Sequence, residues 1–307
     1  MVEVKRAGFV AILGAPNAGK STLVNLIVGS KVSIVSPKVQ TTRARIRGVR
    51  MEGGTQIVLV DTPGIFAPRR TLDRAMVEAA WGGATEADLI VLLVDATRGL
   101  DDDTRRIIDG VREAHRKAIA VINKVDAVAR ERLLPLAKAL DESGVVSDGF
   151  MISALKGDGV DDLVRHLAAR LPEGEWLYPE DQLSDITERF LAAEVVREKL
   201  FLQLGDELPY AATVETERFT EQDDGSARIE ATIFVQKDSQ KPIVLGKDGR
   251  RIKAIGQAAR LDLEGLLGRR VHLFLYVKVR KNWADDPARF RAMGLDFPRP
   301  DAAAKKH

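Results

Sequence analysis

The sequence has 307 residues, 45% of them hydrophobic and 30% charged, which suits a globular protein of about two domains of roughly 150 residues each. Its 47 lysines and arginines against 45 aspartates and glutamates leave a net charge of +2, so any affinity for nucleic acid requires a local basic patch. The absence of cysteine excludes a disulfide framework, a thiolate zinc site and a cysteine nucleophile, and fits a cytoplasmic location. No stretch approaches the roughly 18 consecutive apolar residues of a membrane-spanning helix.

The first half of the chain alternates strand-like and helix-like patterns, which predicts βαβ units around a mostly parallel sheet. We predict strands over residues 8–13, 44–51, 55–61, 88–94, 118–123 and 148–152. We predict helices over residues 20–29, 71–83, 101–115, 130–142 and 159–170. In such a fold a ligand binds beyond the carboxyl ends of the strands, so polar motifs at strand ends are the place to look for function.

The first strand is followed by a phosphate-binding loop of the pattern G-x-x-x-x-G-K-[ST]. A buried strand before it and a helix after it are the context in which backbone N–H groups converge on an anion. Lys20 can reach the outer phosphates, and the Ser21 hydroxyl can bind Mg²⁺. The loop residues predicted to bind nucleotide are Gly14, Ala15, Pro16, Asn17, Ala18, Gly19, Lys20 and Ser21.

The strand over 55–61 ends in a second motif, Asp61-Thr62-Pro63-Gly64. A carboxylate at the tip of this strand can hold Mg²⁺ and its water shell. Gly64 can present its N–H to a γ-phosphate, because no side chain blocks a close approach. An ordinary Pro-Gly turn is the structural alternative for this motif taken alone.

Two further motifs follow later strands. Asn123-Lys124-Val125-Asp126 follows the strand over 118–123, and the Asp126 carboxylate can accept both the N1–H and the amino group of guanine, a pattern that adenine lacks. We expect Asn123 to link neighbouring loops and the Lys124 stem to cover the base. Ser153-Ala154-Leu155 follows the last predicted strand, where small residues let backbone N–H groups reach the guanine oxygen.

The polar stretch over residues 36–43 is a candidate switch. A threonine there can complete the Mg²⁺ shell and sense the γ-phosphate. Thr41 and Thr42 are adjacent and the sequence does not decide between them, although we favour Thr42. A threonine pair that only begins a strand is the structural alternative.

Together these motifs resemble the GTPases of the Ras-like superclass. The resemblance implies GTP or GDP and Mg²⁺ as ligands, with Ser21, Thr42 and Asp61 at the metal and with Lys20, Thr42 and Gly64 acting in hydrolysis. Ile65 stands where Ras-like signalling proteins carry a glutamine, so the catalytic water must be positioned by another group. Asn17 resembles the asparagine of cation-activated GTPases, and K⁺ stimulation is therefore a hypothesis.

The second half follows a Pro- and Gly-rich stretch and has a different pattern. We predict a helix over 186–204, two strands over 211–219 and 227–236 that form a hairpin, and a strand over 271–279. Between them a G-x-x-G loop is predicted to join two helices, which is the order of a type II KH domain. Such a loop clamps the backbone of single-stranded RNA.

Basic residues surround this loop. Residues 237–281 hold twelve lysines and arginines against four aspartates and glutamates, a local excess of eight positive charges. The predicted RNA contacts are Gly246, Lys247, Asp248, Gly249, Arg250, Arg251 and Lys253, although the carboxylate of Asp248 would repel phosphate. A solvated helical face is the structural alternative.

The combination of one Ras-like domain and one KH domain resembles the Era family of bacterial GTPases, and the strand over 271–279 with the following Trp283 resembles that family's carboxyl end. The resemblance implies an α/β phosphate-loop GTPase domain over 1–172, a linker over 173–187, and an α+β type II KH domain with its tail over 188–307. It also implies binding to the 3′ end of 16S ribosomal RNA, assistance in 30S subunit assembly and peripheral association with the cell membrane. We expect a monomer.

Two other functions fit parts of the sequence. One is a GTPase of tRNA modification, which is disfavoured because that family carries a cysteine near its end. The other is a signalling GTPase whose second domain binds protein.

Overall fold

The computed structural model describes residues 5–205 and 208–298, which fall into two units. Among these residues, the first unit contains 5–30, 42–183 and 284–298, and the second contains 31–41, 184–205 and 208–283. Each unit is therefore made of segments that are not contiguous in the sequence, whereas each predicted domain was one continuous range. The outer ends of the predicted domains, residues 1–4 and 299–307, lie outside the described residues.

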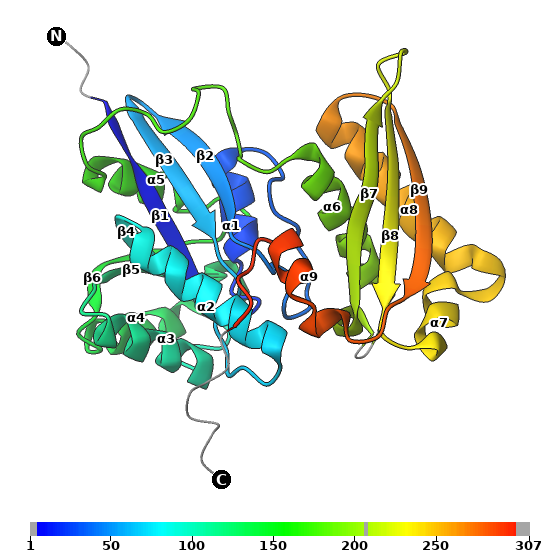
Figure 1. Cartoon of the computed structure of the whole chain (residues 1–307). Coiled ribbons are helices and arrows are strands. Elements are labelled where there is room, and N and C mark those ends of the chain that lie inside the picture. Colours follow the sequence, from blue (N-terminus) through cyan, green and yellow to red (C-terminus); the bar gives the residue numbers. More distant parts are fainter. Residues whose placement is uncertain (1–4, 206–207, 299–307) are drawn as a thin grey trace. The chain divides into compact units, whose positions relative to one another are not determined.

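The first unit is built on a six-stranded sheet in the order β2-β3-β1-β4-β5-β6 (Figure 1). Only β2 is antiparallel to its neighbour, so the predicted mostly parallel sheet is confirmed. Strands β3 and β5 are buried along their whole length, because helices cover both faces of the sheet. The strands are β1 (Arg6–Gly14), β2 (Ile46–Glu52), β3 (Thr55–Asp61), β4 (Leu89–Asp95), β5 (Ala118–Asn123) and β6 (Val146–Met151).

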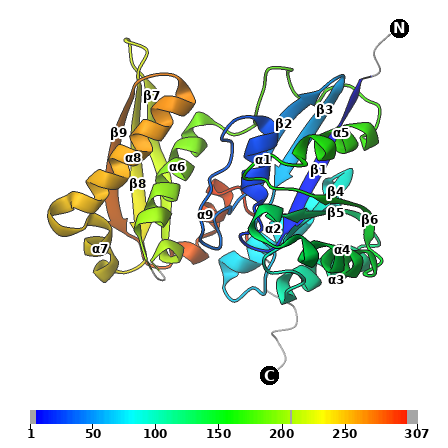
Figure 2. The ribbon, with the colours of Figure 1, turned by 180° about the vertical axis from the view of Figure 1, so that it is seen from behind.

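Helices α1 to α5 cover the two faces of this sheet, which Figures 1 and 2 show from opposite sides. Apolar side chains of α2, α3 and α4 share one core with β1, β4 and β5, while α1 and α5 contact β2 and β3. The helices are α1 (Lys20–Val28), α2 (Thr71–Glu86), α3 (Asp102–Glu113), α4 (Leu133–Asp141) and α5 (Val160–Arg170). The helix predicted over 130–142 begins at Leu133, because residues 130–132 form a tighter 3₁₀ turn.

The second unit has a three-stranded sheet in the order β7-β8-β9, with α6 and α8 packed on one face (Figure 2). β7 and β8 form the predicted antiparallel hairpin, and β9 pairs parallel to β8. Alternate residues of β8, such as Ile229, Ala231 and Ile233, are fully buried against the helices. The elements are α6 (Glu188–Gln203), β7 (Ala212–Glu221), β8 (Ala227–Val235), α7 (Lys241–Leu245), α8 (Arg250–Leu267) and β9 (Val271–Val279).

The predicted linker over 173–187 is mostly bound to the first unit. The side-chain oxygen of the buried Gln56 accepts hydrogen bonds from the N–H groups of Leu177 and Tyr178, and the Trp176 indole donates to the Gly54 carbonyl. Farther along, residues 284–298, which include α9 (Pro287–Ala292), also belong to the first unit.

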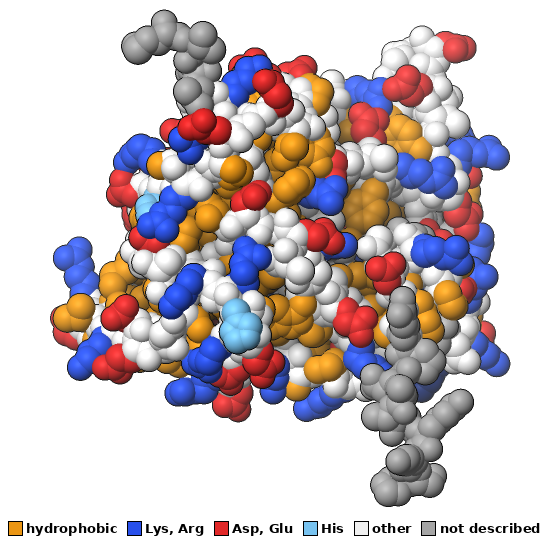
Figure 3. Space-filling view, turned by 60° about the vertical axis from the view of Figure 1, so that its left-hand side comes forward, with side chains coloured by type: hydrophobic (Ala, Val, Ile, Leu, Met, Phe, Trp, Pro, Cys, Tyr) orange, Lys and Arg blue, Asp and Glu red, His pale blue; other side chains and the backbone are white. Residues whose placement is uncertain are grey.

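Lysine and arginine side chains are interspersed with aspartate and glutamate over the face shown in Figure 3, as expected for a net charge near zero. Among residues 5–205 and 208–298, no helix combines the length and the apolar character needed to cross a membrane.

Candidate nucleotide site and RNA-binding loop

The predicted nucleotide motifs lie at one edge of the first sheet. Strands β1, β3, β4, β5 and β6 are mutually parallel, so their carboxyl ends meet there. The phosphate-binding loop follows β1, Asp61 ends β3, Asn123 ends β5 and Ser153 lies just beyond β6. This edge is where ligands bind in open α/β sheets.

The phosphate-binding loop has its shape because two glycines allow a close approach. A Cβ at Gly14 would lie 2.7 Å from the Leu93 carbonyl oxygen. At Gly19, whose φ is +100°, a Cβ would lie 2.4 Å from Nδ2 of Asn123. Helix α1 begins at the next residue, so its N-terminal N–H groups face the loop.

Lys20 is held inside the loop. Its side-chain amine donates to the carbonyl oxygens of Gly14 and Ala15, both at 3.0 Å, and the residue is only 6% exposed. Burial lowers the pKa of Lys20 to about 8, against the opposing effect of the nearby Asp61 carboxylate. At pH 7 the amine is therefore still mostly protonated, which suits it to a phosphate.

Three oxygen-bearing side chains converge beside the loop. The Ser21 hydroxyl lies 2.8 Å from the Thr42 hydroxyl and 2.7 Å from Oδ2 of Asp61, and the Thr42 hydroxyl lies 3.3 Å from the same oxygen. Neighbouring ligands of an octahedral Mg²⁺ at 2.0–2.1 Å lie about 3 Å apart, so this all-oxygen set fits that ion. The Thr41 hydroxyl instead bonds to Ser36 and to the Lys38 carbonyl.

The motif after β3 divides into residues that face the loop and residues that face the core. A Cβ at Gly64 would lie 3.0 Å from the backbone of Pro16, so this glycine lies directly against the phosphate-binding loop. The hydroxyl of the buried Thr62 donates to the Ile12 carbonyl and is thus used within the sheet. Ile65 is fully buried in the core, which means that its side chain cannot position a water molecule.

Asn123 and Lys124 both bond to the phosphate-binding loop. For Asn123, a link between neighbouring loops is what the sequence predicted. The amide nitrogen of Asn123 donates to the Ala18 carbonyl, and its oxygen accepts from the Ala154 N–H. The Lys124 amine donates to the Asn17 carbonyl at 2.7 Å. These bonds join the phosphate-binding loop to the two loops predicted to hold the base.

Asp126 lies beside the loop that follows β6. The hydroxyl of the buried Ser153 donates to the Asp126 carboxylate, which lowers the pKa of Asp126, and the Lys156 amine lies 3.9 Å away. The carboxylate therefore stays ionised, as an acceptor for two N–H donors must be. Leu155 is 80% exposed, but its aliphatic side chain has no hydrogen-bond donor, so at this residue only the backbone N–H can donate to a base.

Sequence reasoning missed two residues at the carboxyl end of β4, Asp95 and Arg98. The Asp95 carboxylate accepts from the Lys124 amine at 2.6 Å and from Thr97. Arg98 donates to the Pro16 carbonyl and pairs with Asp101. Asp95-Ala96-Thr97-Arg98 is a polar stretch at the end of a buried strand, and the rule that located the other motifs would have found it.

In the G-x-x-G loop of the second unit, three of the four residues have a positive φ. Gly246, Asp248 and Gly249 have φ values of 71°, 55° and 71°. A Cβ at Gly246 would lie 2.7 Å from the Cβ of Arg251, whereas a Cβ at Gly249 would meet nothing within 4 Å. The open side of the loop is thus at Gly249, where α8 begins.

Not all of the predicted basic patch is available to a ligand. Arg260, Arg269 and Lys278 form ion pairs with glutamates. Around the loop, Lys247 and Lys253 are exposed and Arg251 donates to the Ile243 carbonyl. The Arg250 side chain is 79% exposed and lies 3.8 Å from the carboxylate of Asp248, which is itself 70% exposed. The cations nearest the loop are therefore the ones best placed to meet phosphates.

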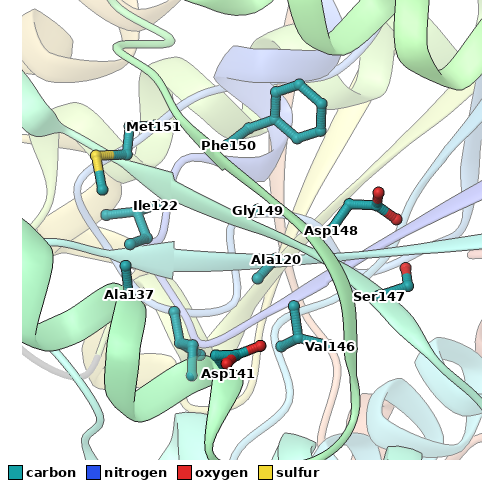
Figure 4. Close-up of a pocket in the computed structure, with 11 residues that line it drawn as sticks. Ala120, Ile122, Ala137, Asp141, Val146, Ser147, Asp148, Gly149, Phe150 and Met151 are labelled. Carbon is teal, nitrogen blue, oxygen red and sulfur yellow. The ribbon is translucent and has the colours of Figure 1, made fainter.

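A cavity of about 180 Å³ lies elsewhere in the first unit, between α4 and the strands β5 and β6 (Figure 4). Ala120, Ile122, Ala137 and Val146 contribute to its mostly apolar wall. None of the predicted site residues lines it, so it is not part of the nucleotide site.

The fold and the two sites define a phosphate-loop GTPase domain joined to a KH domain. The family described as "50S ribosome-binding GTPase" matches residues 9–124, and the KH domain family matches residues 207–284. Proteins described as GTPase Era from Rhizobium meliloti (strain 1021) and Brucella suis biovar 1 (strain 1330) are 60% and 58% identical to this chain. The alignments cover 96% and 95% of this chain and 94% of each relative.

Two solved structures are also similar. Each is 40% identical and covers 94% of this chain and 99% of the solved chain. One is a variant of Aquifex aeolicus Era bound to GDP and AlF₄⁻, with a TM-score of 0.89, and the other is an Era in complex with MgGDPNP and nucleotides 1506–1542 of 16S ribosomal RNA, with a TM-score of 0.90. The chain belongs to the GTPase Era family and is a GTPase with an RNA-binding KH domain.

Proposed function

We propose that this GTPase binds the 3′ end of 16S ribosomal RNA through the Gly246–Gly249 loop and assists assembly of the 30S subunit. The observation that carries the proposal is a relative, 40% identical over 94% of this chain, in complex with nucleotides 1506–1542 of 16S ribosomal RNA. The G-x-x-G loop, with its positive φ values, and the cations beside it suit an RNA ligand. The RNA backbone can approach a glycine closely, and its phosphates bind lysine and arginine electrostatically.

The RNA assignment can be tested with two glycines that cap the same helix. Gly249 precedes α8 and Gly268 follows it, both have positive φ, and a Cβ at either meets nothing within 4 Å. Gly249→Asp and Gly268→Asp therefore add the same charge with similar backbone strain. We expect Gly249→Asp alone to weaken binding of a 16S 3′-end oligonucleotide in a filter assay. Equal affinities for the two variants would contradict the proposal.

We further propose that GTP or GDP occupies the loop over 14–21, that Asp126 selects guanine, and that Ser21, Thr42 and Asp61 hold Mg²⁺. The bound ion would neutralise charge on the phosphates. Lys20 and the N–H of Gly64 would bind the outer phosphates. No described group of three or more histidine, aspartate or glutamate side chains offers a competing metal site.

Thr41 and Thr42 provide a matched test of the metal assignment. Thr42→Ala removes a hydroxyl that lies among the proposed ligands, whereas Thr41→Ala removes one that bonds within residues 36–41. We expect only Thr42→Ala to raise the Mg²⁺ concentration needed for binding a non-hydrolysable GTP analogue. The same Mg²⁺ requirement in both variants would remove Thr42 from the metal site.

K⁺ stimulation through Asn17, peripheral membrane association, a cytoplasmic location and a monomeric state stay predictions from the sequence. The first is tested by comparing hydrolysis in K⁺ and Na⁺ buffers, where equal rates would refute it.

A further inference from the structure

The segment over residues 31–41 belongs to the second unit, although the helix before it and the strand after it belong to the first. Its Lys31 amine binds the Glu198 carboxylate at 2.6 Å and the Asp262 carboxylate at 3.0 Å. The Val35 N–H donates to Glu198 at 3.0 Å, and the Lys38 amine donates to the Leu204 carbonyl. The segment is thus bound to α6 and α8 through Lys31 at its beginning, and to α6 and the residue after it through Val35 and Lys38 in its middle.

Arg197 fastens the end of the segment. It is only 2% exposed, and its guanidinium donates to the Thr41 carbonyl at 2.6 Å and to the Gln40 carbonyl at 3.5 Å. The same guanidinium forms a pair with Glu194 one helical turn earlier. A buried arginine is tolerated only when its donors are satisfied, so the two carbonyls are integral partners of this side chain.

The residue that follows Thr41 is the proposed Mg²⁺ ligand. The Thr41 carbonyl and the Thr42 N–H belong to one planar peptide group, so a fixed carbonyl limits the orientations open to Thr42. In the same structure the Thr42 hydroxyl lies 2.8 Å from Ser21 and 3.3 Å from Asp61. The Arg197 contact to Thr41 and the oxygens that converge with Thr42 are thus only one peptide group apart along the chain.

We propose that Arg197 is a positioning residue for the GTPase reaction: through the Thr41 carbonyl it holds Thr42 ready for Mg²⁺ and the γ-phosphate. The inference rests on the proposed metal role of Thr42 and adds a role for α6 of the second unit. A segment ordered in advance loses less conformational entropy when the ligand binds. The coupling is reciprocal, so Mg²⁺-GTP should strengthen the attachment of residues 31–41 to α6.

The direct test compares two arginines of α6 in the full chain. Arg197→Met removes the contact to Thr41, and Arg189→Met removes a guanidinium on the same helix that donates to the Glu217 carbonyl instead. We expect Arg197→Met to weaken equilibrium binding of the Mg²⁺-GTP analogue by about five- to tenfold, the low end of the usual range for coupled sites, and to change GDP affinity less than about twofold. Arg189→Met should change neither affinity.

Loss of a buried arginine can also weaken folding, so a second pair of variants is needed. Lys31 and Lys199 both bind Glu198 and Asp262, but only Lys31 comes from the segment. We expect Lys31→Met, and not Lys199→Met, to lower the affinity for the GTP analogue relative to GDP. Thermal unfolding midpoints show which variants are folded.

The outcomes separate this inference from the proposed function. If Thr42→Ala raises the Mg²⁺ requirement while folded Arg197→Met and Lys31→Met keep normal affinity for the GTP analogue, Arg197 has no positioning role. Equal losses of GTP-analogue and GDP affinity, or equal effects of Lys31→Met and Lys199→Met, would also overturn it. If Thr42→Ala has no effect on the Mg²⁺ requirement, the proposed metal role of Thr42 is wrong, and the inference that rests on it is wrong as well.

Discussion

At the scale of single residues, the nucleotide site depends on side chains that join loops. Asn123 connects Ala18 to Ala154, and Lys124 connects Asn17 to Asp95. Because each of these side chains contacts two loops, its removal should affect phosphate and base binding together.

Asp126 provides the sharpest test of base recognition. A carboxylate accepts two N–H donors from guanine, whereas the amide of Asp126→Asn accepts one hydrogen bond and donates another. We expect this variant to lose about tenfold or more in GTP affinity, since a hydrogen bond to a charged group is worth about 1.5–3 kcal/mol, and to prefer xanthosine triphosphate.

Competition between the two nucleotides for the purified protein measures this preference. Asp162→Asn, which removes an exposed carboxylate in the first turn of α5, is the control and should not change it. Retention of GTP preference in Asp126→Asn would refute the assignment of the base.

At the scale of elements, the helix α6 combines a core face with two residues that bind the segment over 31–41. Glu198 is 4% exposed, and burial by itself would raise its pKa. Hydrogen bonds from Lys31, the Val35 N–H and Lys199 outweigh burial and lower the pKa of Glu198 below its ordinary value of 4.5. The ionised form is thus the one that stabilises the folded protein.

The sign of this shift predicts how stability depends on pH. A carboxyl with a lowered folded-state pKa contributes stability that is complete above its unfolded-state pKa and is lost as the pH falls through the folded-state value. We expect Glu198→Gln to reduce the free energy of unfolding by about 2 kcal/mol at pH 7, and this deficit to shrink as the pH falls below 4.5.

Denaturant unfolding at several pH values measures the deficit. Glu188→Gln serves as the control, because Glu188 is on the same helix and also forms an ion pair, with Arg269, but its side chain is 49% exposed. Such a pair is worth about 0–1 kcal/mol. A deficit for Glu198→Gln that stays constant with pH would show that ionisation of Glu198 does not stabilise the fold.

At the scale of the whole molecule, the small net charge conceals a local site. Charges of both signs are interspersed over the face shown in Figure 3 and the net charge is only +2, so RNA affinity should come from the cations beside the G-x-x-G loop. Each phosphate contact to single-stranded RNA contributes about −0.7 to the slope of log affinity against log salt concentration. We therefore expect a slope of about −3 if a phosphate is contacted by each of the four cations Lys247, Arg250, Arg251 and Lys253.

Removing two of these cations tests the same point. We expect Lys247→Met with Arg250→Met to reduce the magnitude of the slope by about 1.4. Lys138→Met, which removes a 76% exposed cation from α4, should leave the slope unchanged. An unchanged slope in the double variant would place the RNA elsewhere.

The sequence by itself determined the two fold classes and predicted most of the candidate site residues, because both follow from local patterns. A strand, a glycine turn and a helix N-terminus form the phosphate-binding loop within about fifteen neighbouring residues. The G-x-x-G loop is similarly local. Parallel strands then bring their ends to one edge, so motifs far apart in the chain could be assigned to one site.

Only the tertiary structure decided the contacts between distant segments. It placed Thr42 rather than Thr41 beside Ser21 and Asp61 and buried Ile65 in the core. It also placed Arg98 against the phosphate-binding loop and Asp95 against Lys124. It also assigned residues 31–41 to the unit of α6 and residues 284–298 to that of the GTPase sheet. No local pattern encodes these contacts, because each pairs groups that become neighbours only when the whole chain packs.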